Sequence, residues 1–104
     1  VVMYSLVFNV PVSHVESVKS AIFAVGGGSM DGYENCCWQV LGEGQFKPGS
    51  SSNPFLGTIG EIHKEEEYRV EMAIAKDVKD ECVQALKKSH PYEVVPYYLV
   101  EIIL

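Results

Sequence analysis

The chain has 104 residues, of which 47% are hydrophobic and 21% charged, the size and composition of one globular domain. Its formal net charge is −6 and it contains no basic stripe, so we expect no nucleic-acid partner. No run approaches the roughly 18 apolar residues of a membrane span. Its three cysteines lack a Cys-x-x-Cys spacing and do not indicate a disulfide framework. These features predict a cytoplasmic protein with no membrane partner.

The first quarter of the chain predicts a strand followed by a helix. Residues 2–10 alternate in a way typical of a strand with one apolar side. Ser13 followed by Glu16 forms a capping-box pattern, and apolar residues at helical spacing predict a helix over 14–25. The three glycines at 26–28 are expected to end this helix, because glycine adopts the left-handed conformation at little cost.

The middle of the chain combines a short strand with a long irregular segment. Residues 36–42 alternate and predict a second strand. Residues 44–60 are rich in Gly, Ser, Asn and Pro and are longer than most connections in a compact domain. We therefore expect either a functional loop or an inter-subunit arm, anchored by Phe46 and Phe55.

The last part predicts a strand, a helix and a final strand. Residues 66–75 alternate between an apolar and a charged face, as in a sheet that is covered on one side. Asp77 is expected to cap a helix that Pro91 ends, because proline disfavours helix at the preceding residue. Residues 97–103 form the last predicted strand.

The order β-α-β-β-α-β predicts an α+β fold, a single ferredoxin-like domain over residues 1–104. Its four-stranded antiparallel sheet would carry both helices on one face. The other face is expected to carry polar residues, namely Ser5, Asn9, Glu67, Arg69 and Glu71. Such a face is either solvated or buried by self-association, with its charges paired across subunits.

The tetrapeptide His90-Pro91-Tyr92-Glu93, at the exit of the second helix, is the most distinctive short motif. It could provide a proton-transfer pair, or one metal ligand supported by a carboxylate. Alternatively it ends the helix, with His90 capping the last carbonyls, Pro91 breaking the helix and Tyr92 packing as a lid. The sequence leaves these interpretations open.

Other candidate metal ligands are scattered along the chain. Cys36 and Cys37 could supply a soft ligand, although neighbouring strand residues point to opposite faces, which would place one of them in the core and the other on the opposite face of the sheet. His14 and His63 are isolated in sequence, and each could join a surface metal site with a glutamate. Cys82 lies on the apolar stripe of the second helix and is expected to act as a small hydrophobic residue.

The glycine clusters do not match a nucleotide-binding motif. Residues 26–29 lack the Lys-Ser/Thr of a P-loop, and residues 42–44 lack the third glycine of a dinucleotide fingerprint. No nucleophile and base can be paired from spacing either. We therefore do not expect an enzyme.

Several short motifs follow one another in a defined order. From the start of the chain they are Gly32-Tyr33, Cys37-Trp38, Gly42-x-Gly44-x-Phe46-x-Pro48, Asn53-Pro54-x-x-Gly57-x-x-Gly60, Glu67-x-Arg69-x-Glu71 and His90-Pro91-Tyr92-Glu93. This series resembles the inserted domain of the Nif-three-like (DUF-thirty-four) family, and still more closely the stand-alone proteins made of that domain. One departure is Tyr98, where the family often has an acidic residue.

The resemblance implies a fold and an assembly. The inserted domain is similar to CutA and PII proteins, which are ferredoxin-like and trimeric, and CutA also carries His-Pro-Tyr-Glu near its last strand. It therefore implies a homo-oligomer, a trimer or dimer, with a small ligand or divalent cation at subunit interfaces. The two metal ions of full-length Nif-three-like proteins lie in the outer domain, whose ligand motifs have no match here.

We interpret the chain as a small cytosolic binding or regulatory module of uncharacterised role. Its ligand site is predicted where the 44–60 loop meets the His-Pro-Tyr-Glu corner. The expected contacts are His90 and Glu93 as polar groups, Tyr92 and Phe46 as walls, and Gly42, Gly44 and Gly57 as points of close backbone approach. One alternative is a divalent-metal-binding protein with His90, His63 and Cys37 as ligands, and another is a structural oligomerisation module. No cofactor other than such a metal ion is expected.

Overall fold

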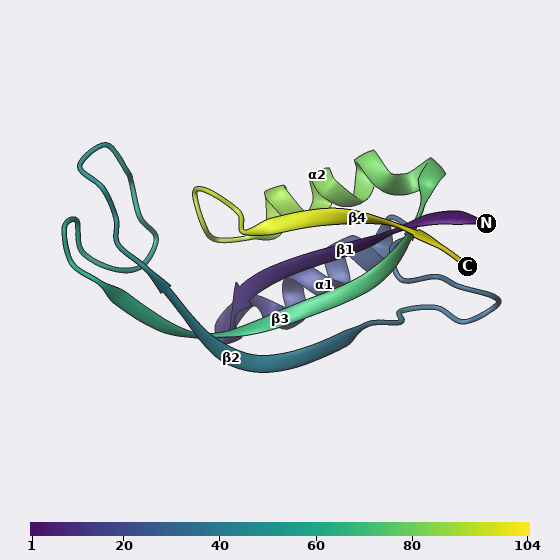
Figure 1. The fold of residues 1–104 in the computed structure, drawn as a ribbon, viewed down its shortest axis with the longest axis horizontal. Helices are drawn as coiled ribbons and strands as arrows, with labels where there is room; N and C mark the ends of the chain where they lie inside the picture. The colour runs from purple at the N-terminus through teal and green to yellow at the C-terminus, as the bar shows by residue number, and fades with distance from the viewer.

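Four strands form one antiparallel sheet in the order β2-β3-β1-β4, and two helices cover one of its faces (Figure 1). The computed structural model describes residues 1–104. The elements are β1 (Val2–Pro11), α1 (Val15–Ala24), β2 (Trp38–Phe46), β3 (His63–Ala75), α2 (Lys79–Ser89) and β4 (Tyr97–Ile103). The predicted ferredoxin-like fold is therefore confirmed.

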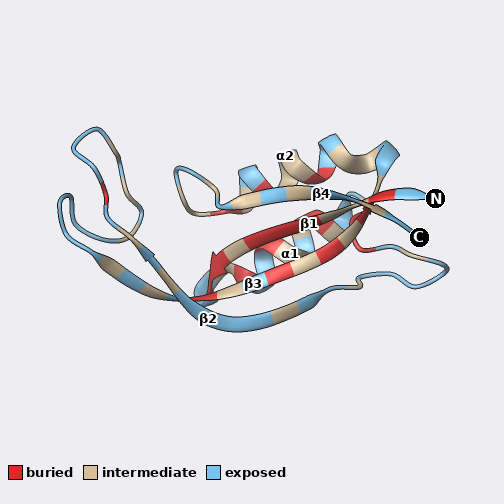
Figure 2. Cartoon of the chain, in the orientation of Figure 1, coloured by how far each residue is buried: buried red, intermediate tan, exposed pale blue.

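The core lies between the sheet and the two helices. Apolar residues that alternate along β1 and β3 meet the apolar stripes of α1 and α2, and Figure 2 shows the buried positions concentrated in the two central strands. The buried cluster consists of Leu6, Phe8, Val10, Val15, Val18, Ile22, Val70, Met72, Ile74, Cys82 and Leu86. Burying an aliphatic or aromatic side chain of this size contributes about 1.5–3 kcal/mol. The core therefore fixes which face of each strand points toward the helices.

The strands β2 and β3 differ from their predicted bounds. β2 begins at Trp38 and extends to Phe46, and β3 begins at His63. The predicted bounds 36–42 and 66–75 are wrong because the two strands remain paired as far as Phe46 and His63. The loop between them covers 47–62 and is called the hairpin loop below.

The two cysteines before β2 are not strand residues. Cys36 is half-buried and Cys37 is exposed, so the predicted placement of one of them in the core is wrong. The pairing of β2 with β3 begins at Trp38, opposite Glu71, so residues 36 and 37 lie outside the ladder. Cys82, in contrast, is fully buried, and burial raises the pKa of its thiol to about 11, as expected of a small core residue.

Both helices begin after a short 3₁₀ turn, and the predicted side-chain caps are absent. The hydroxyl of Ser13 forms a hydrogen bond with the ring of His14, at 2.8 Å. The N-cap residues are His14 for α1 and Val78 for α2, and neither makes a capping hydrogen bond with its side chain. The predicted capping roles of Ser13 and Asp77 are therefore wrong. The glycine stop after α1 is confirmed, because Gly26 adopts a φ of +102°.

The face of the sheet opposite the helices is largely apolar. Residues that pair across the ladder share a face, which places Trp38, Glu71, Val7 and Tyr98 in one row across the sheet. We call this the open face; its exposed apolar residues are Trp38, Val40, Tyr98 and Val100. The predicted placement of Arg69 and Glu71 here is confirmed. These two residues form an ion pair within the chain, at 3.2 Å, and Arg69 also donates to the Tyr98 hydroxyl.

The β2–β3 hairpin extends beyond the helices and gives the molecule its length, 46 Å against 24 and 22 Å in the other directions (Figure 1). Its hairpin loop folds beside the segment that joins α2 to β4. Neither α1 nor α2 has the length and apolar character of a membrane-spanning helix. The distinctive segments of the sequence therefore meet at one end of the sheet.

Candidate functional site

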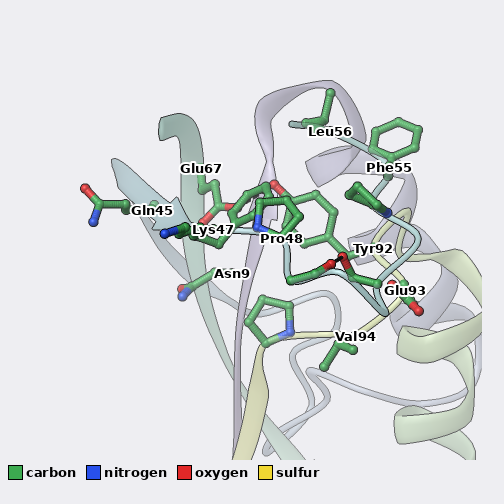
Figure 3. A pocket seen from close by; sticks show the side chains of 16 residues that line it. Asn9, Gln45, Lys47, Pro48, Phe55, Leu56, Glu67, Tyr92, Glu93 and Val94 are labelled. Atoms are coloured by element: carbon green, nitrogen blue, oxygen red, sulfur yellow. Dashed lines mark hydrogen bonds between the residues drawn. The ribbon is translucent and has the colours of Figure 1, made fainter. Parts of the chain in front are cut away.

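A pocket of about 410 Å³ lies where the hairpin loop meets the segment between α2 and β4 (Figure 3). We call it the hairpin pocket. Its walls are Asn9 of β1, residues 44–49, 52 and 54–56 of the hairpin, Glu67 of β3, and residues 92–94 and 96. The predicted meeting of the long loop with the His-Pro-Tyr-Glu corner is thus present in the structure.

A buried carboxylate forms one wall of the pocket. Glu67 is only 8% exposed, and the hydroxyl of Tyr92 donates to its Oε2 at 2.6 Å. Figure 3 shows the two side chains pointing toward each other. Burial, together with the hydrogen bond to Glu67 and its negative charge, raises the pKa of Tyr92 well above its usual value. The phenol therefore stays protonated and acts as the donor that orients the carboxylate.

The other oxygen of Glu67 has no partner in the chain. Oε1 accepts no hydrogen bond from a protein group. Every fully buried polar side-chain atom of the chain has a hydrogen-bond partner, so Oε1, which has none, must be in contact with solvent. Glu67 and Gly44 both line the pocket, and Oε1 borders the space that a side chain at Gly44 would occupy. A bound molecule with a hydrogen-bond donor would find an acceptor there that is already oriented.

Space for the carboxylate depends on Gly44. A Cβ atom at this position would overlap Glu67 Oε1 and lie 2.6 Å from its Cδ, so a side chain here would displace the carboxylate. Gly57 has a φ of +91° and packs closely on His63. The close approach predicted for Gly42 is wrong, because a Cβ there would meet nothing within 4 Å.

Aromatic contacts and one hydrogen bond hold the hairpin loop over the pocket. The ring of Phe46 lies 5.7 Å from that of Tyr92, and Phe55 lies 6.5 Å from Tyr92 and 5.6 Å from His14. The backbone N–H of Asn53 donates to Glu93 Oε2 at 2.8 Å. Phe46 and Tyr92 line the pocket, as predicted, and Glu93 in addition ties the loop to the corner.

His90 supports the pocket but does not line it. Its ring Nδ1 accepts the N–H of Tyr92 at 3.1 Å, so the neutral ring carries its proton on Nε2, which donates to Asn9 O at 2.7 Å. Burial lowers the pKa of His90 below its usual value. Both nitrogens are therefore used to position Tyr92 against β1, and neither is free for the ligand or metal contact predicted from the sequence.

The three predicted metal ligands are not brought together within the chain. His63 bonds to Glu65 at 2.8 Å and lies opposite Phe46 at the end of β2, whereas Cys37 precedes the start of β2. The two ends of this nine-residue strand are eight residue steps, or about 26 Å, apart. No group of three or more His, Cys, Asp or Glu side chains in this chain is arranged to hold a metal ion.

Sequence reasoning missed the central role of Glu67, which was assigned to the outer face of the sheet. The available signal was the Gly42-x-Gly44 spacing, which marks where β2 leaves room above its partner strand. The strand register pairs Gly44 with Glu65, so only the side-chain contacts identify Glu67 as the residue that occupies the space above Gly44. Asn9 was missed for the same reason.

The fold is that of the CutA-like proteins. CutA of Archaeoglobus fulgidus, a periplasmic divalent cation tolerance protein, superposes with a TM-score of 0.67 over 98% of this chain and 84% of its own, at 12% identity. This likeness concerns the fold alone. No protein-family profile matches the chain.

More specific similarity connects the chain to Nif-three-like proteins. A Bacillus cereus protein related to NIF3 matches with a TM-score of 0.83 and 30% identity, over 97% of this chain and 26% of its own. The GTP cyclohydrolase 1 type 2 homolog of Halalkalibacterium halodurans is 37% identical over 97 residues, which cover 93% of this chain and 26% of that protein. The chain thus spans about a quarter of the length of the curated relatives it matches. The resemblance to Nif-three-like proteins is confirmed for that segment.

Replacing Gly44→Ala should disturb the site, whereas Gly42→Ala should not. The added methyl group at Gly44 forces the Glu67 carboxylate away from Tyr92, so we expect unfolding free energy to fall by about 1–2 kcal/mol. Gly42→Ala, on the same strand and face, should stay within about 0.5 kcal/mol of wild type. Urea unfolding measures both, and equal effects of the two variants would contradict the assigned position of Glu67.

The buried His90 should make stability depend on pH. Because its folded-state pKa lies below 6.5, the unfolded chain takes up the proton first as the pH falls. The stabilisation is complete above about pH 6.5 and is lost progressively below it, by at most about 1.4 kcal/mol per pH unit. Urea unfolding between pH 5 and 8 should show a shallower dependence for His90→Gln than for wild type or the control His63→Gln. Identical slopes in all three proteins would refute this assignment.

Proposed function

We propose that this chain is a cytosolic module that binds a small molecule in the hairpin pocket. The observation that carries the proposal is the buried Glu67 carboxylate, held by Tyr92 through one oxygen and accessible through the other. Keeping a carboxylate in a largely apolar setting is costly unless its polar atoms are satisfied. A ligand that donates a hydrogen bond to Oε1 would provide the partner that this oxygen lacks.

The pocket also has the composition of a ligand site. Phe46, Phe55 and Tyr92 provide aromatic walls, and polar side chains such as those of Asn9 and Glu67 also line the pocket. Known small-molecule sites share this combination of apolar walls with a few oriented polar groups. The contacts of Asn53 with Glu93, and of Phe55 with His14, hold the hairpin loop in place before binding, which reduces the entropy lost on association.

Binding without chemistry is the role that the geometry supports. The imidazole of His90 is occupied at both nitrogens, and Tyr92 is a poor proton acceptor because it remains a phenol. The relatives' name refers to GTP cyclohydrolase, but this chain spans only a quarter of their length, so we do not transfer that reaction to it.

The three free cysteines suit a reducing compartment, which supports the cytosolic placement.

A charge panel of three small aromatic probes tests the proposal. The probes are benzamidine, benzamide and benzoate, each titrated at millimolar concentration. We expect at least one of them to shift the backbone amide resonances of residues 44–56 and 92–96. Phe55→Ala should weaken that probe about 2–10-fold, because an aromatic contact is lost. Ile59→Ala is the matched control, since Ile59 lies in the same loop, is as exposed as Phe55 (50% against 51%) and does not line the pocket. The proposal fails if no probe shifts these resonances.

A second role, self-association, is favoured by the open face. Trp38, Val40, Tyr98 and Val100 are exposed there, while the charged pair Arg69 and Glu71 is already neutralised within the chain. Such a face can be buried against a second copy without leaving an unpaired charge. The expected product is a homo-oligomer, a dimer or a trimer, in which the sheets meet.

A charge placed on the open face should dissociate this oligomer. Val40 and Leu41 are neighbours on β2 with similar exposure, 44% and 50%, but they point to opposite faces of the sheet. Val40→Glu should therefore reduce the mass measured by light scattering to that of a monomer, whereas Leu41→Glu should leave the oligomer intact. A wild-type chain that is monomeric at millimolar concentration would exclude the second role.

A further inference from the structure

Resting on the proposed function, we propose that the hairpin pocket selects a flat organic cation that carries N–H donors, such as an amidinium or guanidinium group. Its anchor is Glu67 Oε1. The argument combines the state of that oxygen, the charges around the pocket and the nature of its walls.

The free oxygen of Glu67 fixes the donor requirement. Because Tyr92 occupies Oε2, the carboxylate is held in one orientation, with Oε1 left to accept a hydrogen bond. The residue is more than nine-tenths buried, so only a small part of it, which includes Oε1, is in contact with solvent. A charge-assisted N–H···O⁻ bond is roughly twice as strong as a neutral one, which favours a cationic donor.

The other charged groups of the pocket do not reverse this preference. Two carboxylates, Glu67 and Glu93, line it against one ammonium group, that of Lys47. Lys47 forms an ion pair with neither of these carboxylates. The chain as a whole carries a net charge of −6, which adds to the attraction for a cation. An anionic group such as a phosphate would instead lie close to a buried carboxylate.

The walls account for the flat shape. Phe46 and Phe55 both lie close to Tyr92, with ring centroids 5.7 and 6.5 Å from it, and aromatic faces attract cations. A volume of about 410 Å³ is at the lower end of the range for small-molecule sites, so one substituted ring fits better than an extended ligand. Gly44 leaves the carboxylate accessible to the edge of such a ring, because it places no side chain in front of it.

The three-probe panel distinguishes the chemical class. Benzamidine, a flat cation with N–H donors, should bind at least about tenfold more tightly than the neutral benzamide. Benzoate should leave the resonances of the pocket unshifted. Affinities come from the amide shifts of residues 44–56 and 92–96 as each probe is titrated into the full chain.

Two glutamine substitutions test the anchor. Glu67→Gln keeps the shape of the side chain and an oxygen that can accept from Tyr92, so we expect the fold to persist. It should weaken benzamidine about tenfold and bring it to the affinity of benzamide. Glu66→Gln removes the same charge from the neighbouring exposed position, which points to the opposite face and does not line the pocket. That control should change benzamidine affinity less than about twofold.

The outcomes separate this inference from the proposed function. If benzoate or benzamide binds in the pocket as tightly as benzamidine, or if Glu67→Gln leaves benzamidine affinity unchanged, the pocket binds small molecules but the cation preference is wrong. If none of the three probes shifts the pocket resonances, the proposed function fails and the inference fails with it.

Discussion

One chain of buried hydrogen bonds holds the candidate site together. Asn9 O of β1 accepts from His90, His90 accepts from the backbone of Tyr92, and the Tyr92 hydroxyl donates to Glu67 of β3. The chain joins the two central strands to the segment that follows α2. Every member is buried or half-buried, so the loss of one partner leaves another polar group unsatisfied, at a cost of about 1–3 kcal/mol. The position of the pocket wall is therefore as well defined as the sheet that carries it.

The molecule separates its structural and its candidate functional surfaces. The helix-covered face provides the hydrophobic core, and the open face is a largely apolar surface suited to a second copy. The hairpin pocket lies at the end of the sheet, where β2 and β3 extend past the helices (Figure 1). Variation in the hairpin loop can therefore change what the pocket binds with little effect on the core, as expected when binding residues lie on loops positioned by a rigid scaffold.

Sequence reasoning succeeded where the signal was periodic. Alternation in β1 and β3 placed Tyr68, Val70 and Met72 toward the helices and Arg69 away from them, and the glycine stop after α1 was also recognised. It failed where local patterns competed with pairing between distant segments. Ser13 and Asp77 had the pattern of N-caps, but a 3₁₀ turn precedes each helix. The Gly-rich segment looked irregular at Gly44 and Phe46, although both pair with β3.

The sequence alone determined the order of the elements, their apolar faces and the presence of a long loop and of a helix-ending His-Pro-Tyr-Glu corner. These properties follow from periods of two and 3.6 residues and from turn-forming residues, which act over short distances along the chain. Only the tertiary structure decided that His90 is a support and that Glu67, from 23 residues earlier in the chain, is the accessible polar group. Strand register and burial set those roles, and both depend on contacts between segments that no local pattern connects.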